Sequence, residues 1–198
     1  MGGIRFIVFE GIDGSGKSTQ AMLLARRLEV EGIAVVLTAE PSDGPTGRLI
    51  RSLKTRPDPK EEERLFTEDR RDHVNRVILP ALRQGRTVIC DRYIHSSAAY
   101  QGARGLDSRE IIARNLRFAP LPDVVFLLEI PVEMAVTRIR SARADGFTAF
   151  EAVEDLRAVD AVYRTMDDPV IIRLDGHRDP EEIHRQVMSI LTEAESRA

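Results

Sequence analysis

Residues 11–19 read GIDGSGKST, and this short stretch decides the fold of the chain. It follows an apolar run, Ile4–Glu10, and precedes a segment with helical period, Ser18–Glu31. Glycines let backbone N–H groups turn toward an anion, and the start of a helix adds positive partial charge. A glycine turn with an incidental lysine is the alternative. The pattern Gly-x4-Gly-Lys-Ser between a strand and a helix is typical of a phosphate-binding loop.

Two side chains of this loop carry specific expectations. We expect Lys17 to reach the outer phosphates of a nucleoside triphosphate and the hydroxyl of Ser18 to ligate Mg²⁺. The loop alone does not reveal the acceptor, because switches, motors and small-molecule kinases share it. The acceptor must therefore be inferred from other parts of the chain.

The rest of the chain alternates between apolar runs and helical segments. Runs without polar alternation indicate strands that are covered on both faces. They are Ile4–Glu10, Ala34–Thr38, Thr87–Asp91, Val124–Glu129 and Val170–Leu174. The segments with helical period are Ser18–Glu31, Glu61–Arg83, Ser108–Phe118, Val132–Arg143, Phe150–Tyr163 and Pro180–Ala194. This alternation predicts an α/β, three-layer P-loop NTPase fold, with a five-stranded parallel sheet covered by helices on both faces.

Length and composition limit the organisation and the class of protein. Pro41–Gly47 and Arg56–Pro59 contain turn-forming residues and separate no second core, so we expect one domain over residues 1–198. The net charge of −3 provides no overall attraction for nucleic acid. Cys90, the single cysteine, excludes an intramolecular disulfide and a cysteine-rich zinc site. There is no signal-peptide pattern and no apolar run of ~20 residues. We expect a cytoplasmic protein with no nucleic-acid partner and no membrane partner.

A second polar cluster begins where the run Thr87–Asp91 ends. Ligands of an open parallel sheet bind beyond the carboxyl ends of its strands, where the phosphate loop also lies. We therefore expect Asp91 to support Mg²⁺ together with Ser18, and Arg92 to bind a second phosphate. A salt bridge at the surface is the alternative for Asp91 and Arg92.

Several motifs together are more selective than the phosphate loop. The chain contains FEGIDGSGKSTQ at 9–20, DRY at 91–93 and SSAAYQG at 96–102. It also contains Glu40-Pro41, Phe66-x-x-x-Arg70 and VILPAL at 77–82. These motifs resemble the thymidylate kinase family over nearly the whole chain, from Ile4 to about Ile190. The resemblance implies phosphorylation of dTMP to dTDP with Mg-ATP, in dTTP synthesis, and homodimers are typical of this family.

The resemblance assigns the recognition of thymine to one group of residues. Phe66 and Arg70 are four residues apart, so they lie on one helical face. The resemblance implies that Phe66 stacks on thymine, that Arg70 donates to its O4, and that Ser97 lies near its N3–H. Tyr100 is implied to crowd the 2′ carbon, with Gln101 supporting the same wall. From the helix alone, Phe66 in the core and Arg70 in solvent is the alternative.

The remaining assignments concern the phosphates and the sugar. Arg92 is implied to bind the acceptor phosphate and Asp13 the sugar 3′-hydroxyl. The implied substrate-binding set is Asp13, Glu40, Pro41, Phe66, Arg70, Arg92, Ser97, Tyr100 and Gln101. The implied ATP-binding set is Gly11, Ile12, Asp13, Gly14, Ser15, Gly16, Lys17, Ser18, Thr19 and Arg138, and the implied catalytic set is Lys17, Arg92, Arg140 and Arg143.

We expect a lid around residues 140–150. Residues 144–149 read ADGFTA and interrupt a helical pattern, which is typical of a mobile loop. Members of the family carry a catalytic arginine either in the phosphate loop or in the lid. Ile12–Ser15 contains no arginine, so Arg140 and Arg143 are the lid candidates, with Arg138 placed to stack on adenine. A solvated basic helix end is the alternative for these residues.

The chain departs from the family pattern after the second strand. Many bacterial relatives read Thr-Arg-Glu-Pro, whereas this chain has Ala39 between Thr38 and Glu40. The role of that arginine is therefore vacant or passes to Arg48 or Arg51. The lid also lacks the Arg-Gly pair that is frequent in the family.

Two other functions remain open from the sequence. The first is another nucleoside or nucleoside monophosphate kinase, such as a deoxynucleoside kinase. The second is a nucleotide-dependent switch or regulatory ATPase. Arg92 beside Asp91 argues against a switch, which has no second phosphate to bind.

Overall fold

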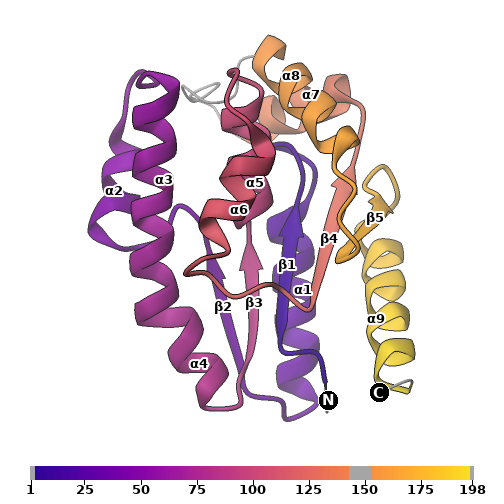
Figure 1. The fold of residues 1–198 in the computed structure, drawn as a ribbon. Helices are drawn as coiled ribbons and strands as arrows, with labels where there is room; N and C mark the ends of the chain where they lie inside the picture. Colours follow the sequence, from indigo (N-terminus) through magenta and orange to yellow (C-terminus); the bar gives the residue numbers. More distant parts are fainter. Residues whose placement is uncertain (1–2, 143–152, 197–198) are drawn as a thin grey trace.

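The computed structural model describes residues 3–142 and 153–196 of the 198-residue chain. Its centre is a parallel sheet of five strands in the order β2-β3-β1-β4-β5 (Figure 1). The strands are β1 (Phe6–Glu10), β2 (Val35–Ala39), β3 (Thr87–Asp91), β4 (Val124–Glu129) and β5 (Ile171–Asp175). The expected α/β class and the five parallel strands are confirmed.

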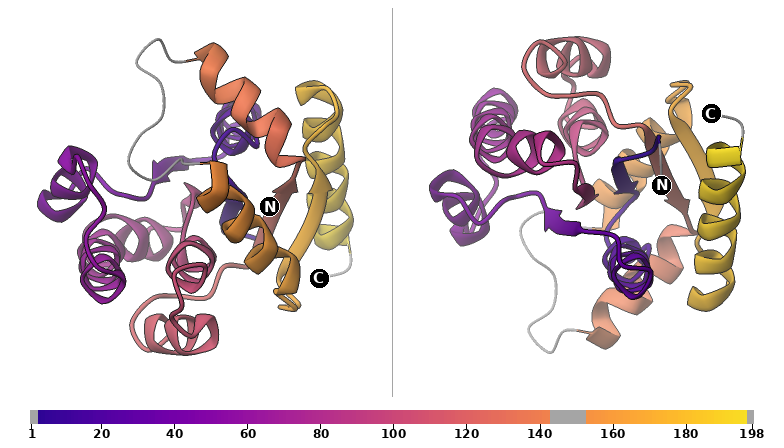
Figure 2. Two further views of the ribbon diagram at one scale, coloured as in Figure 1. Left: turned by 90° about the horizontal axis from the view of Figure 1, so that it is seen from above. Right: turned by 90° about the horizontal axis from the view of Figure 1, so that it is seen from below.

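Helices cover both faces of the sheet because side chains alternate along β1. Ile7 and Phe9 face one way and pack with α1 (Lys17–Val30) and α9 (Pro180–Ser196). Phe6 and Val8 face the other way. Figure 2 shows α1 and α9 on one side of the sheet, and α3, α5, α6 and α8 on the other. The three-layer arrangement is therefore confirmed.

The remaining helices connect the strands. They are α2 (Pro45–Ser52), α3 (Pro59–His73), α4 (Leu79–Arg83), α5 (Ile94–Gly102), α6 (Ser108–Asn115), α7 (Val132–Ala142) and α8 (Val153–Thr165). A π-helical turn, Val74–Ile78, joins α3 to α4, so the expected helix Glu61–Arg83 is continuous but not uniform. Pro80 follows this turn and has no N–H to continue an α-helical ladder. In the described part of the chain, no helix combines the length and the apolar composition needed to cross a membrane.

Three local expectations were incomplete or wrong. The expected turn Pro41–Gly47 ends in helix, because α2 begins at Pro45. Helix α5 lies where only a polar cluster was expected. Strands β2 and β5 are partly exposed, although we expected coverage on both faces. They lie at the two edges of the sheet, where the helical layers end.

Part of the expected lid cannot be compared with the structure. Arg143, the segment 144–149 and the start of the expected helix Phe150–Tyr163 lie outside the described residues. Helix α8 is described from Val153 onward.

Candidate active site

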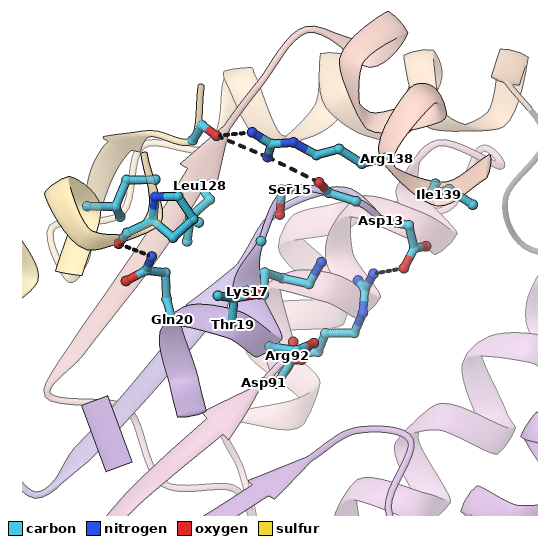
Figure 3. A pocket seen from close by; sticks show the side chains of 16 residues that line it. Asp13, Ser15, Lys17, Thr19, Gln20, Asp91, Arg92, Leu128, Arg138 and Ile139 are labelled. Carbon is cyan, nitrogen blue, oxygen red and sulfur yellow. Dashed lines mark hydrogen bonds and ion pairs between the residues drawn. The ribbon is translucent and has the colours of Figure 1, made fainter. Parts of the chain in front are cut away.

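A cavity of about 460 Å³ lies at the carboxyl ends of β1, β3 and β4, at the top of the sheet in Figure 1. Figure 3 shows the side chains that line it. They come from the phosphate loop and the start of α1, the ends of β3 and β4, the residue after β5, helix α7 and the start of α9. Residues 13–19 line the cavity, whereas Gly11 and Ile12 are buried outside its lining. The structure thus brings the expected phosphate loop to the expected edge of the sheet.

The glycines of the loop have a geometric reason. Gly11, Gly14 and Gly16 have φ angles of 135°, 79° and 102°, in the left-handed region that side chains disfavour. A Cβ on Gly11 would lie 2.5 Å from the carbonyl oxygen of Leu128, and one on Gly14 would lie 2.6 Å from that of Ala135. The loop therefore packs backbone against backbone on β4 and α7.

Lys17 lines the cavity at the start of α1, directly after the phosphate-loop glycines. Its side chain is buried, and Nζ donates to the carbonyl oxygen of Ile12 at 2.8 Å. Burial, and then the charge of Arg92, lower the pKa of Lys17 to about 8. A buried ammonium held in this way gains from the arrival of an anion, which is the behaviour that a phosphate-binding lysine needs.

Ser18 and Asp91 meet beside the loop, as expected for a metal site. The hydroxyl of Ser18 donates to Oδ2 of Asp91. The other oxygen, Oδ1, is buried and has no hydrogen-bond partner among the described residues. No cluster of three or more His, Cys, Asp or Glu side chains suited to a metal occurs in residues 3–142 and 153–196. One hydroxyl and one carboxylate fit Mg²⁺, which keeps several waters and binds substrate phosphates.

Arg92 lines the cavity from the end of β3. Its φ angle is 72°, which is uncommon for a residue with a side chain. Nη2 donates to Oδ1 of Asp13 at 2.7 Å and to the hydroxyl of Tyr100 at 3.1 Å, while the Tyr100 hydroxyl donates to Oδ2 of Asp13 at 2.8 Å. Figure 3 shows Arg92 pointing toward Asp13 across the mouth of the loop. Arg92 and Asp91 both line the cavity, and the salt bridge of Arg92 with Asp13 is largely shielded from solvent, with side chains 15% and 24% exposed. The expected binding of a second phosphate by Arg92 stays a prediction.

The electrostatics of Asp13 follow from this contact. Burial alone raises the pKa of its carboxyl group. The charges of Arg92 and Lys17 outweigh burial and lower the pKa to about 2. Asp13 is therefore a carboxylate at neutral pH, placed between the two cations that would hold phosphates.

Phe66, Arg70, Ser97, Tyr100 and Gln101, the residues expected at the thymine base and the 2′ carbon, are not part of the lining of the cavity. Arg70 is only 1% exposed, so the alternative of a solvated arginine is wrong. It donates to Oε2 of Glu40 at 2.8 Å, to Oδ1 of Asn115 at 2.9 Å and to the hydroxyl of Ser97 at 2.9 Å. Phe66 is half-buried on the same helix, α3. Arg70 and Ser97 are thus brought together as the resemblance implies.

Glu40 and Pro41 stand behind this group. The carboxylate of Glu40 is buried and binds Arg70 on one oxygen and Nδ1 of His73 on the other, at 3.1 Å. The carbonyl oxygen of Pro41 accepts from Nη1 of Arg51 at 2.5 Å. Of Arg48 and Arg51, the two candidates for the role of the arginine that Ala39 replaces, Arg51 thus binds Pro41, two residues after Ala39.

Gln101 lies at the far end of α5. Its Nε2 donates to Oε1 of Glu62 at 2.8 Å, and its Oε1 is buried without a hydrogen-bond partner among the described residues. Glu62 also binds Arg56 and Arg104. Gln101 thus has one acceptor atom left for a ligand or a water molecule.

The basic residues of α7 separate in the structure. Arg138 lines the cavity and donates to the carbonyl oxygen of Gly176 at 3.1 Å and to that of Gly14 at 3.4 Å (Figure 3). Arg140 is exposed on α7 and does not line the cavity. Arg143 lies outside the described residues.

Sequence reasoning missed several residues that hold the site together. Glu10, Ser96 and Tyr163 form one buried network beside the phosphate loop. Glu10 carried a signal, because it is an acidic residue at the end of an otherwise apolar run. Asn115 and His73, which contact Arg70 and Glu40, carried none, because both lie in ordinary helical segments.

Comparisons with known proteins agree with this geometry. The sequence model of a family described as Thymidylate kinase matches residues 9–187. A thymidylate kinase of Desulfotalea psychrophila is 43% identical over 187 residues, covering 93% of this chain and 92% of that protein. A probable thymidylate kinase of Thermococcus kodakarensis is 42% identical over 200 residues, covering 94% and 96%. A thymidylate kinase of Akkermansia muciniphila is 43% identical over 190 residues, covering 95% of this chain and 91% of that protein. The chain belongs to the thymidylate kinase family.

Proposed function

We propose that the protein transfers the γ-phosphoryl group of ATP to dTMP, giving ADP and dTDP on the route to dTTP. Membership of the thymidylate kinase family supports this activity. The observation that carries it is that Lys17 and Arg92 line one cavity from opposite elements, the phosphate loop and the end of β3. Two cations that face one cavity suit the phosphates of two nucleotides, a donor and an acceptor, between which a phosphoryl group is transferred.

The transfer needs no nucleophile from the protein. A phosphate oxygen of dTMP attacks the γ-phosphorus, and the bond from that phosphorus to the β–γ bridging oxygen breaks. Lys17 stabilises the outer phosphates of the donor, and Arg92 holds the acceptor phosphate in line. The backbone N–H groups of the loop share the negative charge with Lys17.

Ser18 and Asp91 are the residues that would hold Mg²⁺. Oδ1 of Asp91 is buried and has no hydrogen-bond partner among residues 3–142 and 153–196, which supports this assignment. When bound, Mg²⁺ neutralises charge that develops on the phosphate oxygens.

Recognition of thymine rests on the group around α3 and α5. We propose that Phe66 stacks on the base, and that Arg70 and Ser97 contact its polar edge. Their mutual contact at 2.9 Å supports a shared ligand atom. Tyr100 and Gln101 would form the wall beside the 2′ carbon, and the carboxylate of Asp13 would accept from the 3′-hydroxyl.

Other parts of the proposal rest on the family resemblance. Glu40 and Pro41 would shape the acceptor site from behind Arg70. Arg138 would stack on adenine, and Arg140 and Arg143 remain the lid candidates for the transferred group. We also propose a single domain with a lid around residues 140–150, a homodimer, and a location in the cytoplasm.

The comparisons do not favour another kinase. A deoxynucleoside kinase binds an acceptor without a phosphate, and Arg92 would then have no phosphate to hold. A switch or regulatory ATPase fails for the same reason.

A panel of acceptors tests the proposed function. ADP release is measured with Mg-ATP and, in turn, dTMP, dUMP, dCMP or thymidine, and the phosphorylated product is identified by mass. We expect a strong preference for dTMP and a product with one more phosphate. Equal use of thymidine, or ADP release without a phosphorylated product, would contradict the proposal.

A further inference from the structure

The buried carboxylate of Glu10 has a contact pattern that the reaction as described above does not use. Glu10 ends β1, directly before Gly11, and its side chain is 0% exposed. Oε1 accepts from the backbone N–H groups of Tyr93 at 2.9 Å and Ser96 at 3.0 Å. Oε2 accepts from the hydroxyls of Ser96 at 2.5 Å and Tyr163 at 2.8 Å. Four donors therefore converge on a carboxylate that does not line the cavity.

Two of these donors are the orphan groups at the start of α5. The first N–H groups of a helix lack partners within it, and a side chain close in sequence usually accepts from them. Tyr93 occupies the position before α5, and its side chain makes no capping bond. Glu10 supplies the cap from 83 residues away. Its negative charge also lies at the positive end of the helix dipole, where an anion is stabilising.

The same carboxylate reaches Arg92 through one hydroxyl. Ser96 Oγ donates to Glu10 and accepts from Nη1 of Arg92 at 3.1 Å. The backbone of Arg92 is left-handed, and such a conformation persists where its surroundings hold it. The N–H of Arg92 donates to the carbonyl oxygen of Phe9 at 2.9 Å. The end of β1 therefore holds both the backbone and the guanidinium of Arg92.

We propose that Glu10 is a positioning residue for the acceptor phosphate. Its carboxylate caps α5 and, through Ser96, holds the guanidinium of Arg92 at a fixed place relative to the phosphate loop. The inference rests on the proposed function, since Arg92 matters there as the ligand of the dTMP phosphate. Tyr163 brings α8 to the same carboxylate, so three elements share one anchor.

The variant Glu10→Gln tests the role, with KM and kcat measured separately for dTMP and ATP. The amide keeps the shape but turns an N–H₂ donor toward the hydroxyls of Ser96 and Tyr163. We expect the KM for dTMP to rise ~10- to 100-fold, the range set by one hydrogen bond to a charged group. The KM for ATP should stay within about twofold of the wild type. In the same variant, hydrogen exchange at the amides of Tyr93 and Ser96 should quicken.

Asp123 offers a matched control at the other end of β1. Its Oδ2 accepts from the backbone N–H groups of Arg5 at 2.7 Å and Phe6 at 2.8 Å. Asp123→Asn thus removes a carboxylate charge that caps the same strand, far from the cavity. We expect both KM values to stay at the wild-type level, and a rise in the KM for dTMP like that of Glu10→Gln would overturn the proposal.

Ser96→Ala carries the test if Glu10→Gln does not fold. It removes only the hydroxyl that joins Glu10 to Arg92, and the KM for dTMP should rise roughly 10-fold. An unchanged KM for dTMP in either folded variant would overturn the proposal.

The proposed function is judged separately. Absence of dTMP turnover in the wild type would contradict it. Calorimetric titration with dTMP alone still judges the positioning role, and a Kd for dTMP unchanged by Glu10→Gln would overturn that role.

Discussion

The two halves of the cavity are built from different parts of the chain. The donor half is a loop of backbone N–H groups whose glycines pack against Leu128 and Ala135. The acceptor half depends on pairs of charged side chains from distant segments. Arg70 binds Glu40 outside the lining of the cavity, and Arg92, which lines it, reaches across to Asp13 of the loop. The first half is specified by nine consecutive residues, 11–19, whereas the second exists only when distant segments meet. A local motif can therefore identify the donor but not the acceptor.

The halves also differ in how they carry charge. Burial lowers the pKa of Lys17 to about 8, so the donor half holds a cation that gains from a ligand. Arg70 and Arg92 each bind a carboxylate of the protein itself. We expect substitutions in the donor half to affect turnover, and those in the acceptor half to affect stability as well.

The largest expected effect is on stability, in Arg70→Ala. The substitution leaves the carboxylate of Glu40 buried without its guanidinium, and breaking a buried pair in this way costs ~3–5 kcal/mol of unfolding free energy. Arg64→Ala is the control, because Arg64 is exposed and solvent screens its pairs with Glu61 and Glu68, so its substitution should cost far less unfolding free energy. Urea unfolding measures both. Similar losses in the two variants would show that the acceptor half is not held by buried pairing.

Next in size is the loss of turnover in Lys17→Met. Removing this preorganised charge should lower kcat ~10²- to 10³-fold, as for other electrostatic contacts in active sites. The unfolding free energy at pH 7 should not fall, because the buried ammonium is unfavourable before a nucleotide binds. Turnover of dTMP and urea unfolding are measured on the same preparation. A variant that keeps its turnover would remove Lys17 from the donor half.

At neutral pH the charge of Lys17 opposes folding and that of Asp13 favours it, and both contributions become more favourable as the pH rises through their own ranges. The pKa of Lys17 falls from 10.5 to about 8 on folding, so the unfolded chain binds more protons between these values. The penalty of Lys17 is present below pH 8 and is relieved by about 3 kcal/mol as the pH rises to 10.5. The pKa of Asp13 falls from 3.8 to about 2, so its contribution of about 2 kcal/mol is present above pH 3.8 and lost as the pH falls through 2.

Unfolding free energies measured across these pH ranges check both signs. Relative to the wild type at each pH, Lys17→Met should remove the alkaline gain that Lys17 contributes. Asp13→Asn should reduce the acidic loss, to which the lowered pKa values of Glu61, Glu133 and Asp175 also contribute. If Lys17→Met left the alkaline rise in place, another group would be its source.

The smallest expected effect is that of Tyr100→Phe. The hydroxyl donates to Asp13 and accepts from Arg92, and one such bond contributes about 1 kcal/mol. We therefore expect the KM for dTMP to rise roughly fivefold, with the KM for ATP unchanged. Steady-state kinetics with each substrate varied in turn measures this. A change in the KM for ATP alone would contradict the placement of Tyr100 in the acceptor half.

Helices α1 and α5 show how far the sequence predicts the fold. The helical period of α1 and the glycine pattern before it are local features of the sequence. They predict both the phosphate-binding loop and the helix that follows it. Helix α5 was missed, because eight of its residues, Ile94–Gln101, are buried and leave no amphipathic period to detect. Its cap is Glu10, far away in sequence. Helix α2 was missed because Pro45, a suitable first helical residue, was interpreted as part of a turn.

The candidate site likewise contains residues whose roles the sequence predicts and residues whose positions it does not. The roles of Lys17 and Ser18 follow from their spacing to the glycines. The burial of Arg70 does not follow from its helix, where polar neighbours favour an exposed position. Its partners, Glu40 and Asn115, are 30 and 45 residues away, and only the resemblance to a family indicated that Arg70 lies in a binding site rather than in solvent.

Strand β1 occupies the middle of the sheet, with Glu10 and Gly11 as consecutive residues at its end. Glu10 contacts Arg92 through Ser96, and Gly11 begins the phosphate loop. The two groups that would hold the reacting phosphates are thus joined by one peptide bond, with about 3.8 Å between the Cα atoms of Glu10 and Gly11. Engineers seeking a different nucleobase can therefore vary the far portions of α3 and α5 while the reacting phosphates keep their separation.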